Sequence, residues 1–137
     1  MNSLILILPA VGFFNALWLY WQGREYRERG RPMVCPLNGH CEKVVFSEYG
    51  FTFGIKNELV GMAYYIALLA GLYLFSFYPA FYPFLAFSFL TATALAALVS
   101  LYLIYIQFFI LRMFCSWCIL ANAINIAIFV SNLVVFL

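Results

Sequence analysis

Residues 112–122 read RMFCSWCILAN, and this stretch places Cys115 and Cys118 where a charged turn gives way to an unbroken apolar run. The run continues to the end of the chain, which is about the 20 residues that a helix needs to cross a hydrocarbon core. A CxxC pair at the edge of a predicted membrane span is the feature from which the rest of the sequence is interpreted.

The composition agrees with a membrane location. Hydrophobic residues make up 67% of the 137 residues and charged residues 9%, which is too apolar for a soluble domain of this size. Eleven of the twelve formally charged residues lie between Arg24 and Glu58, and the twelfth is Arg112. The net charge of +2 forms no basic stripe, so we expect no nucleic-acid partner.

Four apolar segments are long enough to cross a bilayer as helices, the usual form of a spanning segment outside closed barrels. The N-terminal segment lacks a positive leading region, so we interpret it as a retained span rather than a signal peptide. The sequence predicts an all-α integral membrane protein, a four-transmembrane-helix bundle forming one domain over residues 1–137. The predicted spans are residues 3–21, 59–78, 83–110 and 114–137.

A long loop, residues 22–58, separates the first two predicted spans. It begins with the charged run QGREYRERGRP, which is typical of a solvated extension of the first helix. Its second half carries many apolar side chains, which a loop free in solvent rarely has. We therefore expect this half to fold back as a lid over the mouth of the bundle. The apolar residues concerned are Val44, Val45, Phe46, Phe51, Phe53 and Ile55.

The four cysteines form two pairs, one in the loop and one at the start of the last span. Cys35 and Cys41 flank turn-forming residues that allow a disulfide to close. Cys115 and Cys118 fall in the first turn of a helix, where free N–H groups and the helix dipole favour a thiolate. An even number of spans places both pairs on the same side of the membrane. Two neighbouring dithiols can relay electrons by thiol–disulfide exchange, and a lipid-soluble quinone is the natural acceptor at bilayer depth.

Three other interpretations of the cysteines remain open at this point. Two structural disulfides would explain their even number. A four-cysteine zinc site would explain the CxxC, although the five-residue gap in the loop exceeds the usual spacing, so no metal site is expected. Four buried free thiols would behave as small hydrophobic residues.

Several motifs together resemble the vitamin K epoxide reductase family of four-helix membrane thiol oxidoreductases. Besides the loop cysteines they are FSEYGFTFG at 46–54, NELVG at 57–61 and SLYLIYIQFFILRMFCSWCILANAIN at 100–125. The resemblance implies a role for each cysteine. Cys35 would meet an external redox partner, Cys41 would pass electrons to Cys115 through a transient disulfide, and Cys118 would face and reduce the quinone.

The resemblance also assigns roles to two polar residues. Ser47 would help to hold the lid over the quinone site, and Asn57 would hydrogen-bond a quinone oxygen. From the residues alone, Ser47 could equally be a turn hydroxyl and Asn57 the N-cap of the second span. His40 between the loop cysteines could influence their ionisation or simply face solvent.

The function that the resemblance implies is oxidation of dithiols in thioredoxin-like partners with reduction of a quinone, which supports disulfide formation. Vertebrate members carry a tyrosine where this chain has Asn122, so vitamin K epoxide is not the expected substrate, and the acceptor is expected to be a quinone of the ubiquinone, menaquinone or vitamin K type. Many prokaryotic members carry a fused thioredoxin-like domain, whereas this chain ends at Leu137, so we expect a separate thioredoxin-fold partner. The alternative is a non-catalytic four-helix subunit with structural disulfides or a zinc site.

Two arguments about membrane orientation conflict. Disulfide-forming proteins usually face an oxidising compartment outside the cytosol. However, all seven Lys and Arg residues lie on the predicted cysteine face, and the positive-inside rule places such a face in the cytoplasm. We expect a multi-pass cell-membrane protein with a cytoplasmic active face, with an extracytoplasmic face as the alternative.

Overall fold

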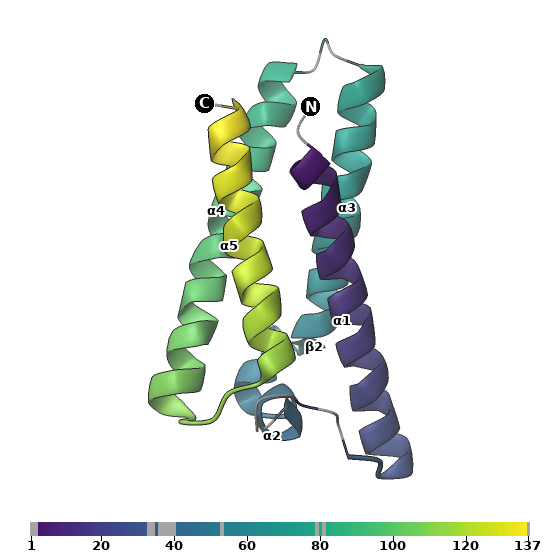
Figure 1. Ribbon diagram of the computed structural model, residues 1–137, viewed down its shortest axis with the longest axis vertical. Helices are drawn as coiled ribbons and strands as arrows, with labels where there is room; N and C mark the ends of the chain where they lie inside the picture. The colour runs from purple at the N-terminus through teal and green to yellow at the C-terminus, as the bar shows by residue number, and fades with distance from the viewer. Residues whose placement is uncertain are drawn as a thin grey trace.

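The computed structural model describes residues 3–32, 35, 41–52, 54–78, 80 and 82–136. Long helices run side by side along the molecule, with both chain ends at the end opposite the short helix α2 (Figure 1). These helices are α1 (Ser3–Arg29), α3 (Asn57–Phe77), α4 (Tyr82–Tyr105) and α5 (Ser116–Phe136). The short elements are α2 (Cys41–Val45), η2 (Glu48–Gly50), β1 (Phe51–Thr52), β2 (Ile55–Lys56) and the π-helical turn η4 (Ile106–Ile110).

Within the described part of the chain, three helical segments are long and apolar enough to cross a membrane: Asn57–Phe77, Pro83–Ile110 and Ser116–Val134. They coincide with the last three predicted spans, so the chain is an all-α, multi-pass membrane protein. The first predicted segment, residues 3–21, lies within α1 and is helical as expected. Its crossing of the membrane stays a prediction.

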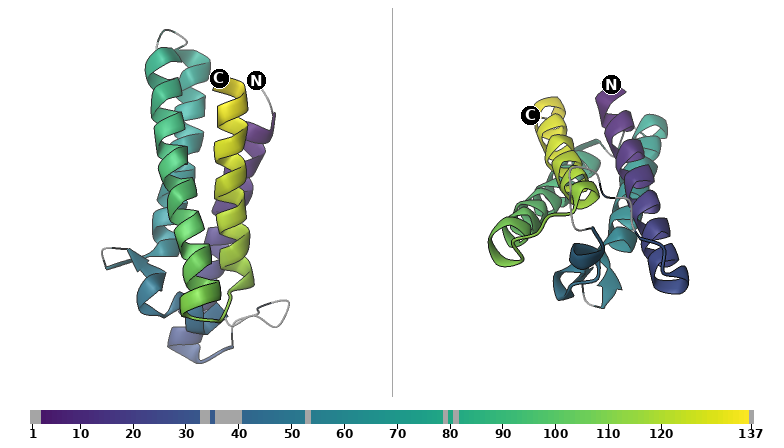
Figure 2. Two further views of the ribbon diagram at one scale, coloured as in Figure 1. Left: turned by 90° about the vertical axis from the view of Figure 1, so that its left-hand side faces the viewer. Right: turned by 60° about the horizontal axis from the view of Figure 1, so that its bottom comes forward.

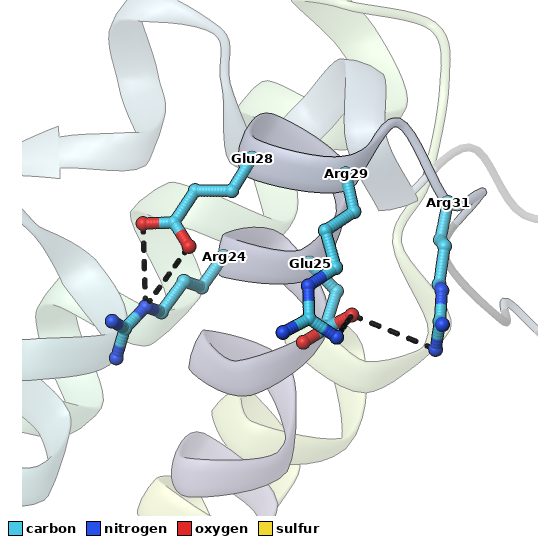
Figure 3. Close-up of polar contacts among 5 residues, drawn as sticks. All are labelled: Arg24, Glu25, Glu28, Arg29 and Arg31. Atoms are coloured by element: carbon cyan, nitrogen blue, oxygen red, sulfur yellow. Dashed lines mark hydrogen bonds and ion pairs between the residues drawn. The ribbon is translucent and has the colours of Figure 1, made fainter.

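The polar part of α1 continues the helix well past the apolar segment, as the charged run predicts. Arg24 Nε lies 3.4 Å from Glu28, and Arg29 lies 3.5 Å from Glu25. Arg31, just beyond the helix, also reaches Glu25 at 3.6 Å (Figure 3). Pairs four residues apart support a solvated helix by a few tenths of a kcal/mol each, on the order of 0.3–0.5. This segment is therefore a solvated extension of α1.

The helices pack in two close approaches toward the end that carries the termini. A Cβ atom at Gly12 of α1 would lie 2.6 Å from the Tyr65 ring of α3, and one at Gly71 of α3 would lie 2.6 Å from the Phe89 ring of α4. Glycine at these positions lets a neighbouring aromatic ring lie against the helix backbone. The rings join a core drawn from all four long helices: Ala16, Tyr65, Leu68, Leu72, Phe89, Ile124 and Ile128.

The second half of the long loop folds only partly as predicted. Val44 and Val45 of α2 are buried, and Phe46 packs against the same cluster. Phe51 and Ile55, by contrast, are 40% and 52% exposed, so these two side chains are not buried against the bundle, and the lid stays a prediction. They belong to the two-residue hairpin β1–β2, which projects from the side of the bundle (Figure 2, left). Phe53 lies outside the described residues.

Candidate functional site

The outer cysteine pair is a disulfide. Cys35 and Cys41 are bonded, with their Cα atoms 5.7 Å apart. Cys41 is the first residue of α2 and is fully buried, whereas Cys35 is partly exposed. The bond confirms that this loop segment can close on itself, and it means that these two sulfurs are neither free thiols nor thiolate ligands for zinc.

The inner pair, Cys115 and Cys118, is in the thiol form. Cys115 immediately precedes α5, and the Cys118 N–H donates to Cys115 Sγ at 3.2 Å. The sulfur therefore takes the position that a serine or aspartate oxygen takes in an N-cap, accepting one of the free N–H groups of the helix. The positive end of the helix dipole points at the same atom.

A glutamine from the preceding helix fixes the backbone of this turn. The Cys115 N–H donates to Gln107 Oε1 at 2.9 Å, and the Gln107 carbonyl accepts from Met113 N–H at 3.1 Å. Gln107 lies in the π-helical turn η4 and is 3% exposed. Between η4 and α5 the chain reverses through Arg112, whose φ of +53° places it in the left-handed region. Gln107 thus holds the start of α5, and with it Cys115, against the bundle.

The two cysteine pairs meet at this end of the bundle. Cys41 and Cys115, both 0% exposed, belong to one buried cluster with Leu19 of α1 and the two valines of α2. Cys35 and Cys118 pack against the same cluster. The Ser116 hydroxyl lies 3.8 Å from Cys35 Sγ and can donate to it. The structure therefore brings together all four cysteines that the sequence singles out.

Cys118 lines a cavity of about 370 Å³ whose wall comes from the four long helices and from α2, η2 and η4. Its wall is mostly aliphatic, with side chains such as Val45, Leu95 and Leu103. Pockets of about 300–1,000 Å³ with a few polar groups in an apolar wall are typical of small-molecule sites. The cavity therefore offers a place for a flat, lipophilic molecule directly beside a thiol.

Three polar atoms in the cavity wall are left without a hydrogen bond. Among the described residues, the buried side-chain atoms that have no hydrogen-bond partner are Asn15 Oδ1, Glu58 Oε2 and the Tyr64 hydroxyl, and all three residues line this cavity. Buried polar atoms are nearly always paired, so three unpaired ones in residues around one cavity point to a ligand or water that would complete them. The Tyr64 hydroxyl can donate to a quinone oxygen, whereas Asn15 Oδ1 only accepts and needs a donor such as water or a quinol hydroxyl.

The remaining predicted site residues have different positions. Asn57 lines the cavity, as expected for a residue that contacts the ligand. Ser47 is not among the described residues of the wall, and its hydroxyl donates to the Val44 carbonyl at 2.7 Å. It therefore fastens the end of α2, whose valines line the cavity. His40 lies outside the described residues.

An ion pair lies where β2 leads into α3. Lys56 Nζ is 3.9 Å from Glu58 Oε2 and 4.1 Å from the centre of the Phe46 ring. Burial lowers the pKa of Lys56; nearby Arg27 acts in the same direction, while Glu58 opposes it. The pair connects the cavity wall to the charged end of α1.

Sequence reasoning did not predict roles for Asn15, Glu58, Tyr64 or Gln107. A signal was present, because amides and ionisable groups inside or at the start of apolar segments are costly unless they face the protein interior. The sequence could not show whether these side chains point into the bundle. A helix that is apolar on every side has no polar stripe to indicate which face turns inward.

The sequence model described as the vitamin K epoxide reductase family matches residues 3–133 of the chain. No curated protein matches the chain significantly.

Proposed function

The chain belongs to the vitamin K epoxide reductase family, and from that premise we propose that it oxidises dithiols of a thioredoxin-fold partner and passes the electrons to a membrane quinone. Family membership supports a quinone-linked thiol oxidoreductase in general. The assignment of steps to individual residues is our proposal. It is supported by their order in space at one end of the bundle, where the disulfide lies next to the dithiol and the dithiol lies next to the cavity.

In the first half of the proposed cycle, electrons enter through the outer pair. A partner thiolate attacks Cys35, and the partner leaves oxidised while Cys35 and Cys41 become thiols. The Cys41 thiolate then attacks Cys115 of an inner disulfide, which releases Cys118 as a thiolate and forms a transient Cys41–Cys115 bond. Cys35 resolves that bond. The products are an outer disulfide and an inner dithiol, which are the bonding states that the four cysteines have here.

In the second half, the inner dithiol is oxidised. When bound, a quinone accepts two electrons and two protons, and Cys118 is the sulfur that lines its proposed cavity. Cys115 then closes the disulfide with Cys118. Asn57 is proposed to donate a hydrogen bond to a quinone oxygen, and Ser47 to hold α2 in place beside the cavity. The aliphatic wall excludes water from the reaction.

The surroundings of the site complete the proposal. We propose that α1 is the fourth span, that the second half of the loop at residues 22–58 forms a lid over the cysteine end, and that residues 1–137 act as one domain. With Asn122 in the wall, where vertebrate members have tyrosine, ubiquinone or menaquinone is the proposed acceptor.

The active face is proposed to lie in the cytoplasm, because all seven Lys and Arg residues belong to the cysteine face. A variant that keeps only Cys35 reports this directly. In sealed cells, an impermeant thiol reagent should leave it unlabelled until the membrane is opened. Labelling of intact cells would place the face outside.

The single observation that carries the proposed function is that Cys41 and Cys115 share one buried cluster while Cys118 opens onto the cavity. Purified protein, given a dithiol and a short-chain quinone analogue, should consume the ultraviolet absorbance of the quinone. Cys118→Ala should reduce this rate to the uncatalysed background. Ser76→Ala, which removes only a hydroxyl bonded to the Leu72 carbonyl, is the folding control. Wild-type turnover by the Cys118 variant would refute the proposal.

A further inference from the structure

The cavity wall contains a buried carboxyl group that the thiol chemistry does not use. Glu58, in the first turn of α3, is 5% exposed, and its Oε2 atom has no hydrogen-bond partner among the described residues. Glu58 lines the same cavity as Cys118 and acts on it electrostatically. An ionisable side chain buried at the edge of a span is expensive, so its presence there indicates a function.

The carboxyl is also connected to the surface. Lys56 Nζ lies 3.9 Å from Glu58 Oε2, and the Lys56 side chain is 11% exposed against 3% for Glu58. A Cβ atom at Gly23 of α1 would lie 3.3 Å from Lys56 Nζ, so the lysine rests against the polar extension of α1. Burial lowers the pKa of Lys56, which makes its ammonium a better proton donor than an exposed lysine. Lys56 therefore lies between Glu58 and the polar extension of α1, and proton transfer between the two side chains requires the 3.9 Å gap to close to a hydrogen bond.

We propose that Glu58 donates a proton to the quinone oxygen during reduction and is reprotonated through Lys56, an inference that rests on the proposed function. The balance is complete. The inner dithiol loses two electrons and two protons when it becomes a disulfide, and the quinone gains two of each when it becomes quinol. One proton reaches one quinone oxygen from Glu58 and is replaced from solvent through Lys56. Of the two thiol protons, one is transferred to the other quinone oxygen and the other returns to solvent.

Glu58 is favoured over the other two unpaired groups of the wall for chemical reasons. The unpaired Asn15 Oδ1 only accepts hydrogen bonds and has no proton to give. The Tyr64 hydroxyl has one, yet among the described residues Glu58 alone of the three is ion-paired to a residue that reaches the surface. Tyr64 is therefore suited to orienting the ring.

The titratable and charged groups around Glu58 define what a pH profile reports. They are Lys56 on β2, Cys118 on α5, and Tyr64 and Tyr65 on α3, with Arg27 of α1 acting through Lys56. Because Glu58 acts electrostatically on Cys118, a change at residue 58 also changes the ionisation of that thiol. Thiolate absorbance is therefore followed with pH in each variant, and the pH profile of quinol formation is compared with it to separate the two effects.

The test uses full-length protein with its inner pair reduced, mixed once with a short-chain ubiquinone analogue. Glu58→Gln keeps the shape of the side chain but cannot transfer a proton, and it should slow quinol formation about 100-fold or more. The deficit should grow as pH rises, because solvent protons must replace the side chain. Glu58→Asp should recover part of the rate. The rate of Lys56→Met should lie between those of Glu58→Gln and Glu58→Asp. Glu48→Gln, which changes an exposed carboxyl in η2, is the matched control and should behave as wild type.

Two readouts other than turnover separate a proton donor from a structural residue. Quinone binding, followed by quenching of tryptophan fluorescence, should change less than threefold in Glu58→Gln. Infrared difference spectra of the wild type should show a glutamic-acid carbonyl band that changes when quinone becomes quinol, and Glu58→Gln should lack it. Equal rates and pH profiles in wild type and Glu58→Gln, or no such band in the wild type, would overturn the role of Glu58 alone. A wild type that reduces no quinone would overturn the proposed function as well.

Discussion

The two ends of the bundle are packed differently. Toward the termini, the core around Leu72 and Phe89 encloses a void of only about 10 Å³, near the minimum that one water molecule needs. Two hydroxyl groups there bond to their own helix, Thr93 to the Phe89 carbonyl at 2.6 Å and Ser76 to the Leu72 carbonyl at 3.2 Å. The cysteine end contains a cavity of about 370 Å³ and three unpaired polar atoms.

The end with the termini therefore contributes mainly to stability, and the cysteine end contains the proposed site of the chemistry. Close packing in the core around Leu72 and Phe89 provides the dispersion contacts that hold the four helices together when lipid surrounds them. An open cavity with unpaired polar atoms lowers stability, so it persists where a ligand occupies it during function. Ser100 and Asn125, which hydrogen-bond each other at 2.9 Å in the cavity wall, mark the boundary between the two regions.

The largest predicted effect comes from breaking the link between the outer and inner pairs. Cys41→Ser should reduce turnover with a protein dithiol to background, because the outer pair can no longer pass electrons to Cys115. Small permeant dithiols that reach the inner pair should still support part of the wild-type rate. Quinone absorbance measured with each reductant in turn checks this. Equal loss with both would contradict an ordered relay.

The next largest effect comes from filling the cavity at the cysteine end, so that this end is packed as closely as the other. Ala96→Phe places a ring in the cavity and should raise KM for the quinone about 10- to 100-fold. Its melting temperature should stay near wild type, because the added ring fills existing space. Leu98→Phe, on the exposed surface of the same helix, is the control. An unchanged KM in the Ala96 variant would mean that the quinone binds elsewhere.

The smallest effect compares one leucine from each region. Leu72→Ala removes a side chain that is 3% exposed in the packed core and should lower the free energy of unfolding by about 2–5 kcal/mol. Leu103→Ala should cost less, because that side chain already borders the cavity and has fewer contacts to lose. Unfolding in detergent micelles measures both. Equal losses would show that the two ends are packed alike.

Much of this organisation could be predicted from the sequence, for identifiable reasons. Bilayer thickness dictates span length, so hydropathy located the segments that became α3, α4 with η4, and α5. The spacing of the cysteines predicted a closable outer pair and an inner pair at a helix start. The resemblance placed Asn57 in the wall.

The rest depends on how helices rotate about their axes, which apolar composition does not encode. The inward turn of Gln107 arises from a π-helical turn, and the convergence of Asn15, Glu58 and Tyr64 arises from packing of α1 against α3. The projecting hairpin shows the same limit, because Phe51 and Ile55 are apolar yet exposed.

The central claim is that the buried sulfurs of Cys41 and Cys115 exchange bonds beside the cavity. A double variant, Cys35→Ala with Cys118→Ala, keeps only these two cysteines and tests it most directly. After mild oxidation, peptide mass spectrometry should find them joined within one chain in most molecules. A variant that keeps only Cys35 and Cys118 sets the background for nonspecific pairing. Free thiols at Cys41 and Cys115, with no bond above that background, would contradict the account.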